Sequence, residues 1–323
     1  MEERQTAPYM IAPATPRIVV TRRIPEPGLE LLESAGDVWV NPDDRALGSE
    51  ELHRAIAGAD AVVTMLHDRV DDGFFVAAGP QLRSVANVAV GYDNVDVAAA
   101  ERHGVVVTNT PGVLTDSTAD LAIALMLAVT RRLGEGERLI RGGSGWSWNM
   151  FFMLGTSLTG KRLGIVGPGQ IGRATARRAE AFGMEVVYAG RSGGLEELLK
   201  TSDVVSLHCP LTPDTRHLIN AERLALMRSS AYLINTARGP VVDEAALVRA
   251  LQDRVIAGAG LDVFENEPEV HPGLLELDNV VLVPHLGSAT VETRTAMASL
   301  AAENVVRVLG GDPPLTAVTS VGD

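Results

Sequence analysis

Short apolar segments alternate with amphipathic segments along the chain from Arg17 onward. The apolar segments RIVVT, DVWV, DAVVTM, LRSVANV and VVVTN predict strands. The segments between them, PGLELLESA, SEELHRAIAG, DDGFFVAAG and NVDVAAAERHG, predict helices with one apolar face. Because strands that alternate with helices form parallel sheets covered on both faces, this part of the chain predicts an α/β domain.

The pattern changes beyond residue 110. A segment from Asp116 to Leu133 is apolar on most of its circumference and predicts a long, buried helix. A stretch rich in Gly and Trp, 134–160, then precedes a second series of strands and helices. The last predicted helix, about 291–309, has no sheet of its own to cover, so we expect it to return to the N-terminal domain.

The expected fold is therefore α/β, with two doubly wound parallel-sheet domains. The first domain comprises 17–110 and 292–323 and is discontinuous, and the second comprises 111–291. A length of 323 residues is comfortable for two domains. We expect a cleft between them that is lined by the carboxyl ends of strands, where ligands bind in such folds.

The composition limits which kinds of binding partner and which cellular compartment we expect for this protein. A formal charge of −13 argues against nucleic acid or an anionic membrane as a general partner. The one cysteine, Cys209, excludes an internal disulfide and fits a reducing compartment. No apolar run reaches membrane-spanning length, and the leader MEERQTAPYMIAPATP lacks the order of a secretory signal. We therefore expect a cytoplasmic protein, with the leader as a frayed tail. We expect no bound metal, because the histidines lack the spacing of metal ligands.

The most informative motif is LGIVGPGQIG, a strand that leads into a turn with three glycines and then a helix. The first glycine permits a tight bend, the second lets the backbone approach a diphosphate, and the third lets helix pack on strand. The diphosphate is expected at the helix N-terminus, where free N–H groups favour negative charge. A glycine-rich turn without a ligand is the simpler alternative, but the flanking strand and helix favour a dinucleotide site. The expected cofactor contacts are Gly167, Gly169, Gln170, Ile171 and Gly172.

The end of the next strand, EVVYAGRS, indicates which dinucleotide binds. An NAD site usually carries Asp or Glu here, which accepts hydrogen bonds from the ribose hydroxyls. This chain has Arg191 and Ser192 instead, and these suit a 2′-phosphate. Arg191 could also be a solvated surface residue. We interpret the pair as a preference for NADP(H), with NAD(H) as the second candidate.

Four polar residues lie at the ends of three strands in the second domain. Arg238 follows YLINT, Asp262 and Glu267 lie at the end of AGAGLDV, and His285 follows VVLVP. Hydride transfer to a 2-oxo acid needs a cation that holds the carboxylate and polarises the carbonyl. It also needs a proton donor that titrates near neutrality, and a carboxylate beside an imidazole keeps that imidazole charged and fixes its tautomer.

Each of these residues has a simpler interpretation when it is taken alone. Arg238 could be a surface ion-pair partner, Glu267 a loop acid, and His285 a satisfied turn histidine. Their common location at strand ends of one domain favours a joint catalytic role.

The glycine turn, the Arg238 segment, the Asp262–Glu267 segment and PHLGSAT have the order and spacing of the D-isomer-specific 2-hydroxyacid dehydrogenases, which the chain resembles from Arg17 onward. The resemblance implies a flavodoxin-like substrate domain, a Rossmann cofactor domain, and a catalytic triad of Arg238, Glu267 and His285. It implies that hydride passes to C2 of the substrate while His285 donates a proton to its oxygen. The implied substrate contacts are Val90 and Gly91 through their backbone N–H groups, Arg238, His285 and Trp148. The further cofactor contacts are Thr118, Pro210, Thr236, Asp262 and Gly287.

Two of these contacts have alternatives. The segment NVAVGYDNVD also predicts an ordinary strand-to-helix turn that Asp93 or Asn94 caps, and we expect this turn to serve as an anion site. Thr118 fits a helix-entry hydroxyl equally well.

Within the family, two features resemble the glyoxylate and hydroxypyruvate reductases. One is the Gly190–Ser192 strand end, as in NADPH-using members, and the other is the segment GWSWNMFFMLG. They imply NADPH-preferring reduction of glyoxylate and hydroxypyruvate to glycolate and D-glycerate, by a homodimer with an interface arm near 134–160 in the cofactor domain. Trp146 and Trp148 could instead only bury surface at the dimer contact. The alternative functions are a dehydrogenase for D-lactate-like or phosphorylated substrates and a nicotinamide-sensing regulatory protein of the same fold.

One departure from the family lies after Gly194, where the chain continues directly with LEELLKTSDVV. Members usually have on the order of a dozen more residues at this point, which form a short helix and the next strand of the nucleotide fold. Either the adenosine-side edge is shorter in this protein, or a disordered segment is missing from the sequence. The departure lies beside the proposed 2′-phosphate site.

Overall fold

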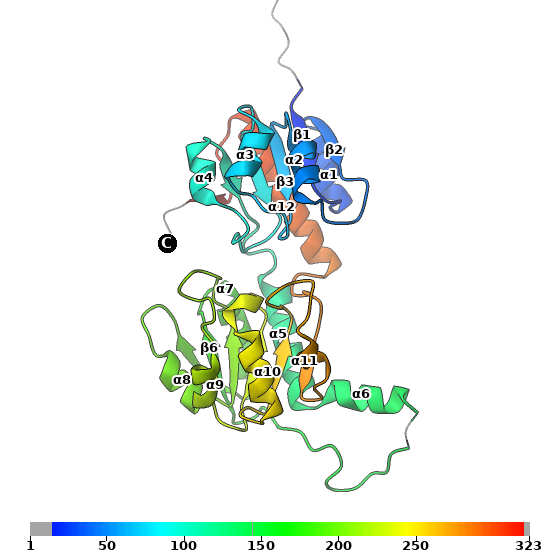
Figure 1. The fold of residues 1–323 in the computed structure, drawn as a ribbon, viewed down its shortest axis with the longest axis vertical. Helices are drawn as coiled ribbons and strands as arrows, with labels where there is room; N and C mark the ends of the chain where they lie inside the picture. Colours follow the sequence, from blue (N-terminus) through cyan, green and yellow to red (C-terminus); the bar gives the residue numbers. More distant parts are fainter. Residues whose placement is uncertain (1–14, 144, 320–323) are drawn as a thin grey trace, which may run out of the picture. The chain divides into compact units, whose positions relative to one another are not determined.

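The computed structural model describes residues 15–143 and 145–319. The chain divides into two compact units. Unit 1 contains the chain up to Thr110 and again from Thr295, and unit 2 is Pro111–Arg294 (Figure 1). The leader over 1–14 and the last residues, 320–323, for which a frayed tail and part of the first domain are expected, lie outside the described residues.

Unit 1 is built on one six-stranded sheet. Its strands are β1 (Arg17–Val20), β2 (Asp37–Val40), β3 (Ala61–Thr64), β4 (Ser84–Asn87), β5 (Val106–Thr108) and β12 (Ala317–Val318). They lie in the order β12-β5-β4-β3-β1-β2, and all pairs are parallel except β12 with β5. The sequence pattern did not predict β12, which is only two residues long.

The helices of unit 1 connect these strands, as the parallel pairing requires. They are α1 (Glu26–Glu33), α2 (Ser49–Ile56), α3 (Asp72–Ala78), α4 (Val97–Arg102) and the larger part of α12 (Val291–Gly310). A Cβ on Gly28 would lie 2.9 Å from Ala298, so α1 and α12 are in direct backbone contact. The last helix therefore packs on the N-terminal sheet unit.

Unit 2 is built on a second six-stranded sheet, in which all pairs are parallel. Its strands are β6 (Arg162–Val166), β7 (Glu185–Ala189), β8 (Val204–Leu207), β9 (Tyr232–Asn235), β10 (Gly258–Leu261) and β11 (Val280–Leu282). They lie in the order β11-β10-β9-β8-β6-β7. The strand order reverses direction between β6 and β8, and ligands of doubly wound folds bind at such a point, outside the carboxyl ends of the strands.

Most helices of unit 2 lie against this sheet, whereas the helix over Leu133–Arg141 projects away from it and has no buried residue (Figure 1). The helices of unit 2 are α5 (Thr115–Thr130), α6 (Leu133–Arg141), α7 (Gln170–Ala181), α8 (Leu195–Thr201), α9 (Ala221–Leu226), α10 (Glu244–Gln252), α11 (Pro272–Leu275) and one short 3₁₀ turn (Gly239–Val241). The fold class predicted from the sequence, two parallel-sheet α/β domains, is confirmed.

One predicted helix is wrong at its end. The expected helix over 116–133 ends at Thr130, and Arg132 has a φ of 55°, in the left-handed region that interrupts a helix. A separate helix, α6, follows in the stretch where no helix was predicted. Gly134 and Gly136 lie inside α6 and weaken its sequence signal.

The described residues contain no helix that combines the length and the apolar content needed to cross a lipid bilayer.

Candidate active site

The glycine turn joins β6 to α7, and each glycine has its own structural reason. Gly167 has a φ of 94°, and a Cβ there would lie 2.7 Å from the backbone nitrogen of Cys209. A Cβ on Gly172, in the first turn of α7, would lie 2.4 Å from the carbonyl oxygen of Gly167. At Gly169, by contrast, a Cβ would meet nothing within 4 Å. The N-terminus of α7, with Gln170 and Ile171 in its first turn, therefore opens onto space beside Gly169, which fits a bound diphosphate.

The connection from β7 to α8 is a tight glycine turn. The N–H of Gly193 donates to the carbonyl of Gly190 at 3.0 Å, and Gly193 and Gly194 have φ values of 104° and 86°. The chain thus enters α8 directly after this turn, at the point where the sequence is shorter than is usual in the family it resembles. Arg191 and Ser192 lie on this turn and are exposed.

Glu267 and His285 are in contact. The Glu267 Oε2 atom lies 2.7 Å from His285 Nδ1, and Glu267 Oε1 accepts the N–H of Phe264 at 3.0 Å. Burial alone would raise the pKa of Glu267, but the hydrogen bond and charge of His285, the N–H of Phe264 and the charge of Arg238 lower it below its usual value. Glu267 is thus an ionised partner that binds one ring nitrogen of His285 and leaves the other for a reacting group.

Asp262 determines the backbone of the turn that carries His285. This buried carboxylate accepts the N–H groups of Leu286 and Gly287, and its own carbonyl accepts the N–H of His285 at 2.8 Å. Burial raises the pKa of Asp262, although its backbone hydrogen bonds and His285 act in the other direction. His285 itself has a φ of 52°, a backbone conformation that costs about 1–3 kcal/mol and persists only where the surrounding contacts impose it. The hydrogen bonds to Asp262 impose this backbone conformation on His285.

Thr118 locks the same turn to α5. Its buried hydroxyl donates to the carbonyl of Gly287 at 3.2 Å. A Cβ on Gly287 would lie 3.2 Å from Asp262 Oδ2 and 3.3 Å from Thr118, so the turn leaves little room for any other residue. Both polar side chains, predicted as cofactor contacts, thus have a structural partner in unit 2, and their cofactor contacts stay predictions.

Arg238 lies at the end of β9, on a segment that contacts the Glu267 loop. A Cβ on Gly239 would lie 1.8 Å from the carbonyl oxygen of Phe264, so only glycine permits this close approach. The Asn235 side chain donates to the carbonyl of Arg238 at 3.0 Å and accepts the N–H of Ala237 at 3.0 Å. The Nη1 atom of Arg238 donates to the Ala237 carbonyl at 2.9 Å. The guanidinium is therefore held at the carboxyl end of the sheet, beside the Glu267 loop.

Three side chains for which the sequence carries no signal, those of Glu244, Glu265 and His217, hold the Glu267 loop against the start of α10 and the segment before α9. Buried Glu244 accepts the N–H groups of Glu265, at 2.7 Å, and of His271, at 3.1 Å. Glu265 in turn accepts the N–H of Glu244 at 3.3 Å and lies 2.6 Å from His217 Nε2. A carboxylate in the first turn of a helix usually faces solvent, so no local signal distinguishes Glu244.

The other predicted residues lie as follows. Thr236 follows β9, and its buried hydroxyl has no hydrogen-bond partner among the described residues, which fits a polar group supplied by a cofactor. Pro210 follows β8 and is exposed, and the side chain of Gln170 is within 3.4 Å of the Thr115 hydroxyl. Trp148 lies in the segment that follows α6 and is 73% exposed. In residues 15–143 and 145–319, no three His, Cys, Asp or Glu side chains are grouped to hold a metal ion.

Val90 and Gly91 lie in unit 1, in the loop after β4. Both residues are partly buried, and their carbonyl oxygens accept side-chain hydrogen bonds. The structure thus brings Arg238, Glu267 and His285 together in one unit and places the predicted carboxylate loop in the other.

The arrangement in unit 2 can perform general acid catalysis beside a dinucleotide site. An imidazole with a carboxylate on one ring nitrogen can donate a proton from the other. A guanidinium on the neighbouring strand end can bind a carboxylate and polarise a carbonyl. Both lie at the carboxyl ends of the sheet that carries the glycine turn, as do the cofactors of doubly wound folds.

Comparison with known proteins places these features in one family. Residues 123–287 match the model of the NAD-binding domain of D-isomer-specific 2-hydroxyacid dehydrogenases. A glyoxylate reductase of Thermococcus onnurineus is 48% identical over 320 residues, which cover 94% of this chain and 96% of that protein.

Solved structures give the same grouping. A protein of Thermus thermophilus is 45% identical, with a TM-score of 0.89 and coverage of 94% of this chain and 100% of that one. An NADPH-dependent glyoxylate/hydroxypyruvate reductase of Sinorhizobium meliloti, solved with NADP and malonate, is 37% identical. Its TM-score is 0.81, with coverage of 94% of this chain and 97% of that one.

Proposed function

The chain belongs to the D-isomer-specific 2-hydroxyacid dehydrogenases and is an oxidoreductase, and we propose that it reduces glyoxylate and hydroxypyruvate to glycolate and D-glycerate with NADPH as the preferred reductant. The observation that carries the chemistry is the 2.7 Å contact of Glu267 with His285, in the unit that also contains Arg238 and the glycine turn. The substrate class is supported by relatives named for glyoxylate and hydroxypyruvate reduction.

Each side chain has one part in this reaction. The bound nicotinamide cofactor supplies the hydride that C2 of the 2-oxo acid receives. Arg238 binds the substrate carboxylate and polarises the carbonyl. His285 gives the proton of its Nε2 atom to the carbonyl oxygen, which becomes the hydroxyl of the product. Glu267 holds His285 through Nδ1 and stabilises its charged form until the proton leaves.

A substrate panel tests the proposal. Glyoxylate, hydroxypyruvate, pyruvate and a phosphorylated 2-oxo acid are each assayed with NADPH and with NADH at equal low concentration. We expect the highest kcat/KM for glyoxylate or hydroxypyruvate with NADPH. A higher value for pyruvate or the phosphorylated acid would assign the chain to another activity of its family.

The cofactor preference is supported by the turn after β7. Arg191 and Ser192 are exposed there, and Gly190 occupies the strand end where an NAD site usually has a carboxylate. Hydrogen bonds to a charged group contribute about 1.5–3 kcal/mol, which is roughly ten- to a hundredfold in affinity. We therefore expect kcat/KM to be at least about tenfold higher with NADPH than with NADH.

Arg191→Ala should remove most of that difference by raising KM for NADPH and leaving KM for NADH nearly unchanged. Arg177→Ala, at an exposed arginine further along α7 and away from its N-terminus, is the matched control and should keep the preference. Equal kcat/KM values of the wild type with the two cofactors would show that Arg191 does not bind a 2′-phosphate.

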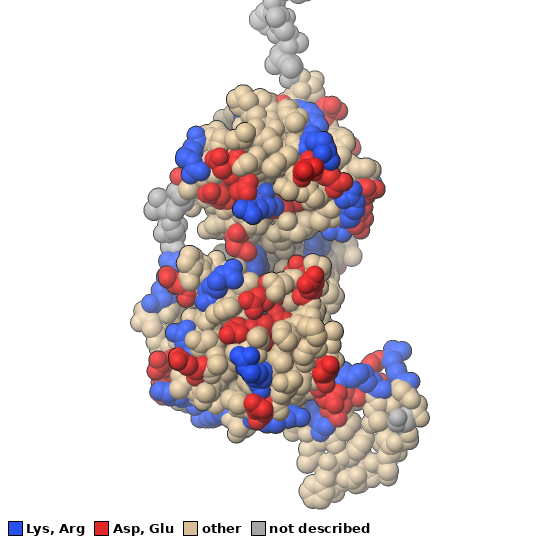
Figure 2. Space-filling model, in the orientation of Figure 1, with Lys and Arg blue, Asp and Glu red and all other residues tan. Residues whose placement is uncertain are grey.

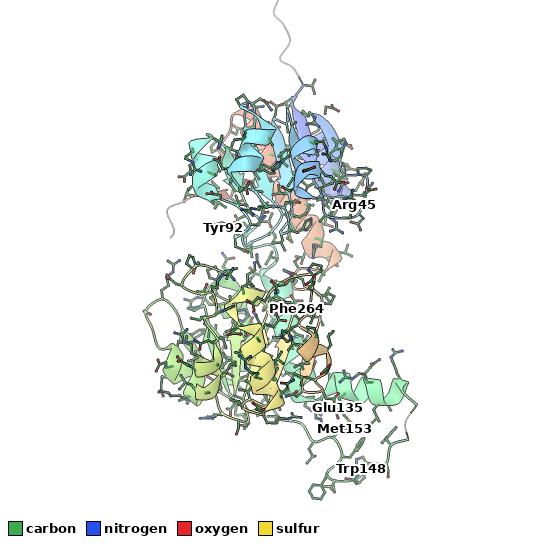
Figure 3. All side chains as sticks on the ribbon, viewed as in Figure 1. Arg45, Tyr92, Glu135, Trp148, Met153 and Phe264 are labelled. Atoms are coloured by element: carbon green, nitrogen blue, oxygen red, sulfur yellow. The ribbon has the colours of Figure 1, made fainter. Side chains whose placement is uncertain are left out.

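We also propose a homodimer through an arm, defined as α6 and residues 145–154. The arm carries large apolar side chains that water reaches, including Trp148 at 73% and Phe151 at 84% exposure. Figure 2 shows its outer part as an uncharged surface, and Figure 3 shows Trp148 and Met153 on it. Monomers rarely expose contiguous apolar patches of this kind, whereas interfaces are rich in Trp, Phe and Met.

Light scattering tests the dimer. We expect a mass of about two chains for the wild type and of one chain for Phe151→Asp. Val76→Asp, at an apolar side chain of unit 1 that is also exposed, should leave the dimer intact. A wild-type mass of one chain at micromolar concentration would contradict the proposal.

A further inference from the structure

The loop after β4 has three consecutive carbonyl groups that are each bonded to the body of unit 1. They belong to Ala89, Val90 and Gly91. The N–H of Thr110 donates to the Ala89 carbonyl at 2.8 Å. The Asn109 side-chain nitrogen donates to the Val90 carbonyl at 2.8 Å, and that of Asn87 donates to the Gly91 carbonyl at 3.1 Å.

This bonding determines where the N–H groups point. In a planar trans peptide, the N–H of each residue is antiparallel to the carbonyl of the residue before it. The N–H groups of Val90, Gly91 and Tyr92 therefore face away from the donors that hold the three carbonyls. None of these three N–H groups has an acceptor among the described residues. Tyr92 is exposed, at the edge of unit 1 (Figure 3).

Successive backbone N–H groups without acceptors can form an anion site of backbone dipoles. We propose that Asn109 and Asn87 are positioning residues of this site, which turn the N–H groups of Gly91 and Tyr92 toward the substrate carboxylate. The inference rests on the proposed function, because that function supplies a substrate with a carboxylate.

Asn87 is itself held in place. It is fully buried, and its Oδ1 atom accepts the Thr64 hydroxyl and Asn94 Nδ2, both at 3.2 Å. The same Asn94 nitrogen donates to the carbonyls of Met65 and Asp68 at 3.1 and 3.0 Å. Asn87 therefore connects the Gly91 carbonyl to the segment that follows β3.

Asn109 is fixed from the other side. Its N–H donates to the carbonyl of Thr316 at 3.3 Å, and its carbonyl accepts the Thr316 hydroxyl at 2.7 Å. With its backbone held by Thr316, the Asn109 side-chain nitrogen is placed to donate to the Val90 carbonyl. An asparagine amide suits this task because its nitrogen donates, whereas an aspartate at this position would only accept and would repel the Val90 carbonyl.

The test uses Asn109→Ala and Asn109→Asp in the full chain. The readouts are KM and kcat for glyoxylate and the calorimetric affinity of the NADPH-loaded enzyme for oxalate, a dicarboxylate probe that takes no hydride. The matched control is Gln81→Ala, because the Gln81 amide also donates to a backbone carbonyl, that of Ala78, but at the amino end of β4. Thermal unfolding of all variants shows how much each amide contributes to stability.

We expect Asn109→Ala to raise KM for glyoxylate and to weaken oxalate binding by about tenfold each, since an N–H bond to a charged group is worth roughly ten- to a hundredfold in affinity. The kcat should change less, because the carboxylate contact is the same in substrate and transition state. Asn109→Asp should bind oxalate more weakly still, and Gln81→Ala should bind oxalate with the affinity of the wild type.

Unchanged oxalate affinity in Asn109→Ala, or an equal loss in Gln81→Ala, would overturn the inference, as would a wild type that binds no oxalate. If the wild type reduces no 2-oxo acid, the proposed function fails, and the oxalate titration still decides whether Asn109 orients an anion site.

Discussion

His285→Ala should lower kcat for glyoxylate reduction by about 10²–10⁴-fold, the usual contribution of general acid catalysis. His285 is the imidazole that the structure pairs with Glu267, at 2.7 Å through Nδ1, so its Nε2 atom is the proton donor in the proposed reaction. Alanine cannot donate, and water must then supply the proton. NADPH affinity should stay near the wild-type value, because the glycine turn, Arg191 and Ser192 are unchanged.

The matched control for this loss is His103→Ala. His103 also pairs with a carboxylate, since its Nε2 atom lies 3.1 Å from Asp72, but it belongs to the surface of unit 1. We expect this variant to keep kcat within about threefold of the wild type, in line with the small effects of most surface substitutions. A His285→Ala enzyme with near-normal kcat would remove His285 from the proton transfer.

The alternation of strands and helices predicted most of the fold, because parallel sheets bury both faces and leave long apolar runs. The segments RIVVT and DAVVTM contain β1 and β3. The pattern failed where the signal was local and weak. The helix break at Arg132 depends on one left-handed residue, and β12 is too short to show a pattern.

Residue type and position along the chain predicted the candidate site residues, but they did not predict the contacts that hold these residues in place. Arg238, Glu267 and His285 are identified by their strand ends and their family motifs. The contact of Thr118 with Gly287 joins residues 169 positions apart, and no local pattern reports such a pair. Glu244 is buried and holds the Glu267 loop through backbone N–H groups, which are the same in every sequence.

The loop after β4 also shows what the sequence alone could not predict. The sequence predicted Val90 and Gly91 as backbone donors from a family resemblance. The direction of each N–H group depends on what holds the carbonyl before it. For Val90 this is the N–H of Thr110, and for Gly91 it is the side chain of Asn109, which comes 19 positions after Val90. Only the folded unit shows that the three successive carbonyls are all hydrogen-bonded to unit 1.

Arg238→Lys should lower kcat/KM for glyoxylate by about 10²-fold or more, the usual cost of losing a preorganised hydrogen-bond donor in the transition state, although it keeps the charge. A guanidinium offers two parallel N–H donors to a carboxylate, whereas an ammonium is a point charge on a flexible stem. The position leaves no room for compensation, because Gly239 contacts the Phe264 carbonyl and the Asn235 side chain holds the Arg238 carbonyl.

The loss should appear in both kcat and KM, because Arg238 binds the substrate carboxylate and also polarises the carbonyl in the transition state. Arg249→Lys, at an exposed arginine on α10 in the same unit, is the matched control and should leave kcat/KM unchanged. Circular dichroism of both variants reports whether the fold is intact. A loss in Arg238→Lys of only a fewfold, in a folded enzyme, would mean that Arg238 contributes charge alone and that another group grips the carboxylate. A loss confined to KM would mean that Arg238 binds substrate and transition state equally, so that the polarisation of the carbonyl must come from His285.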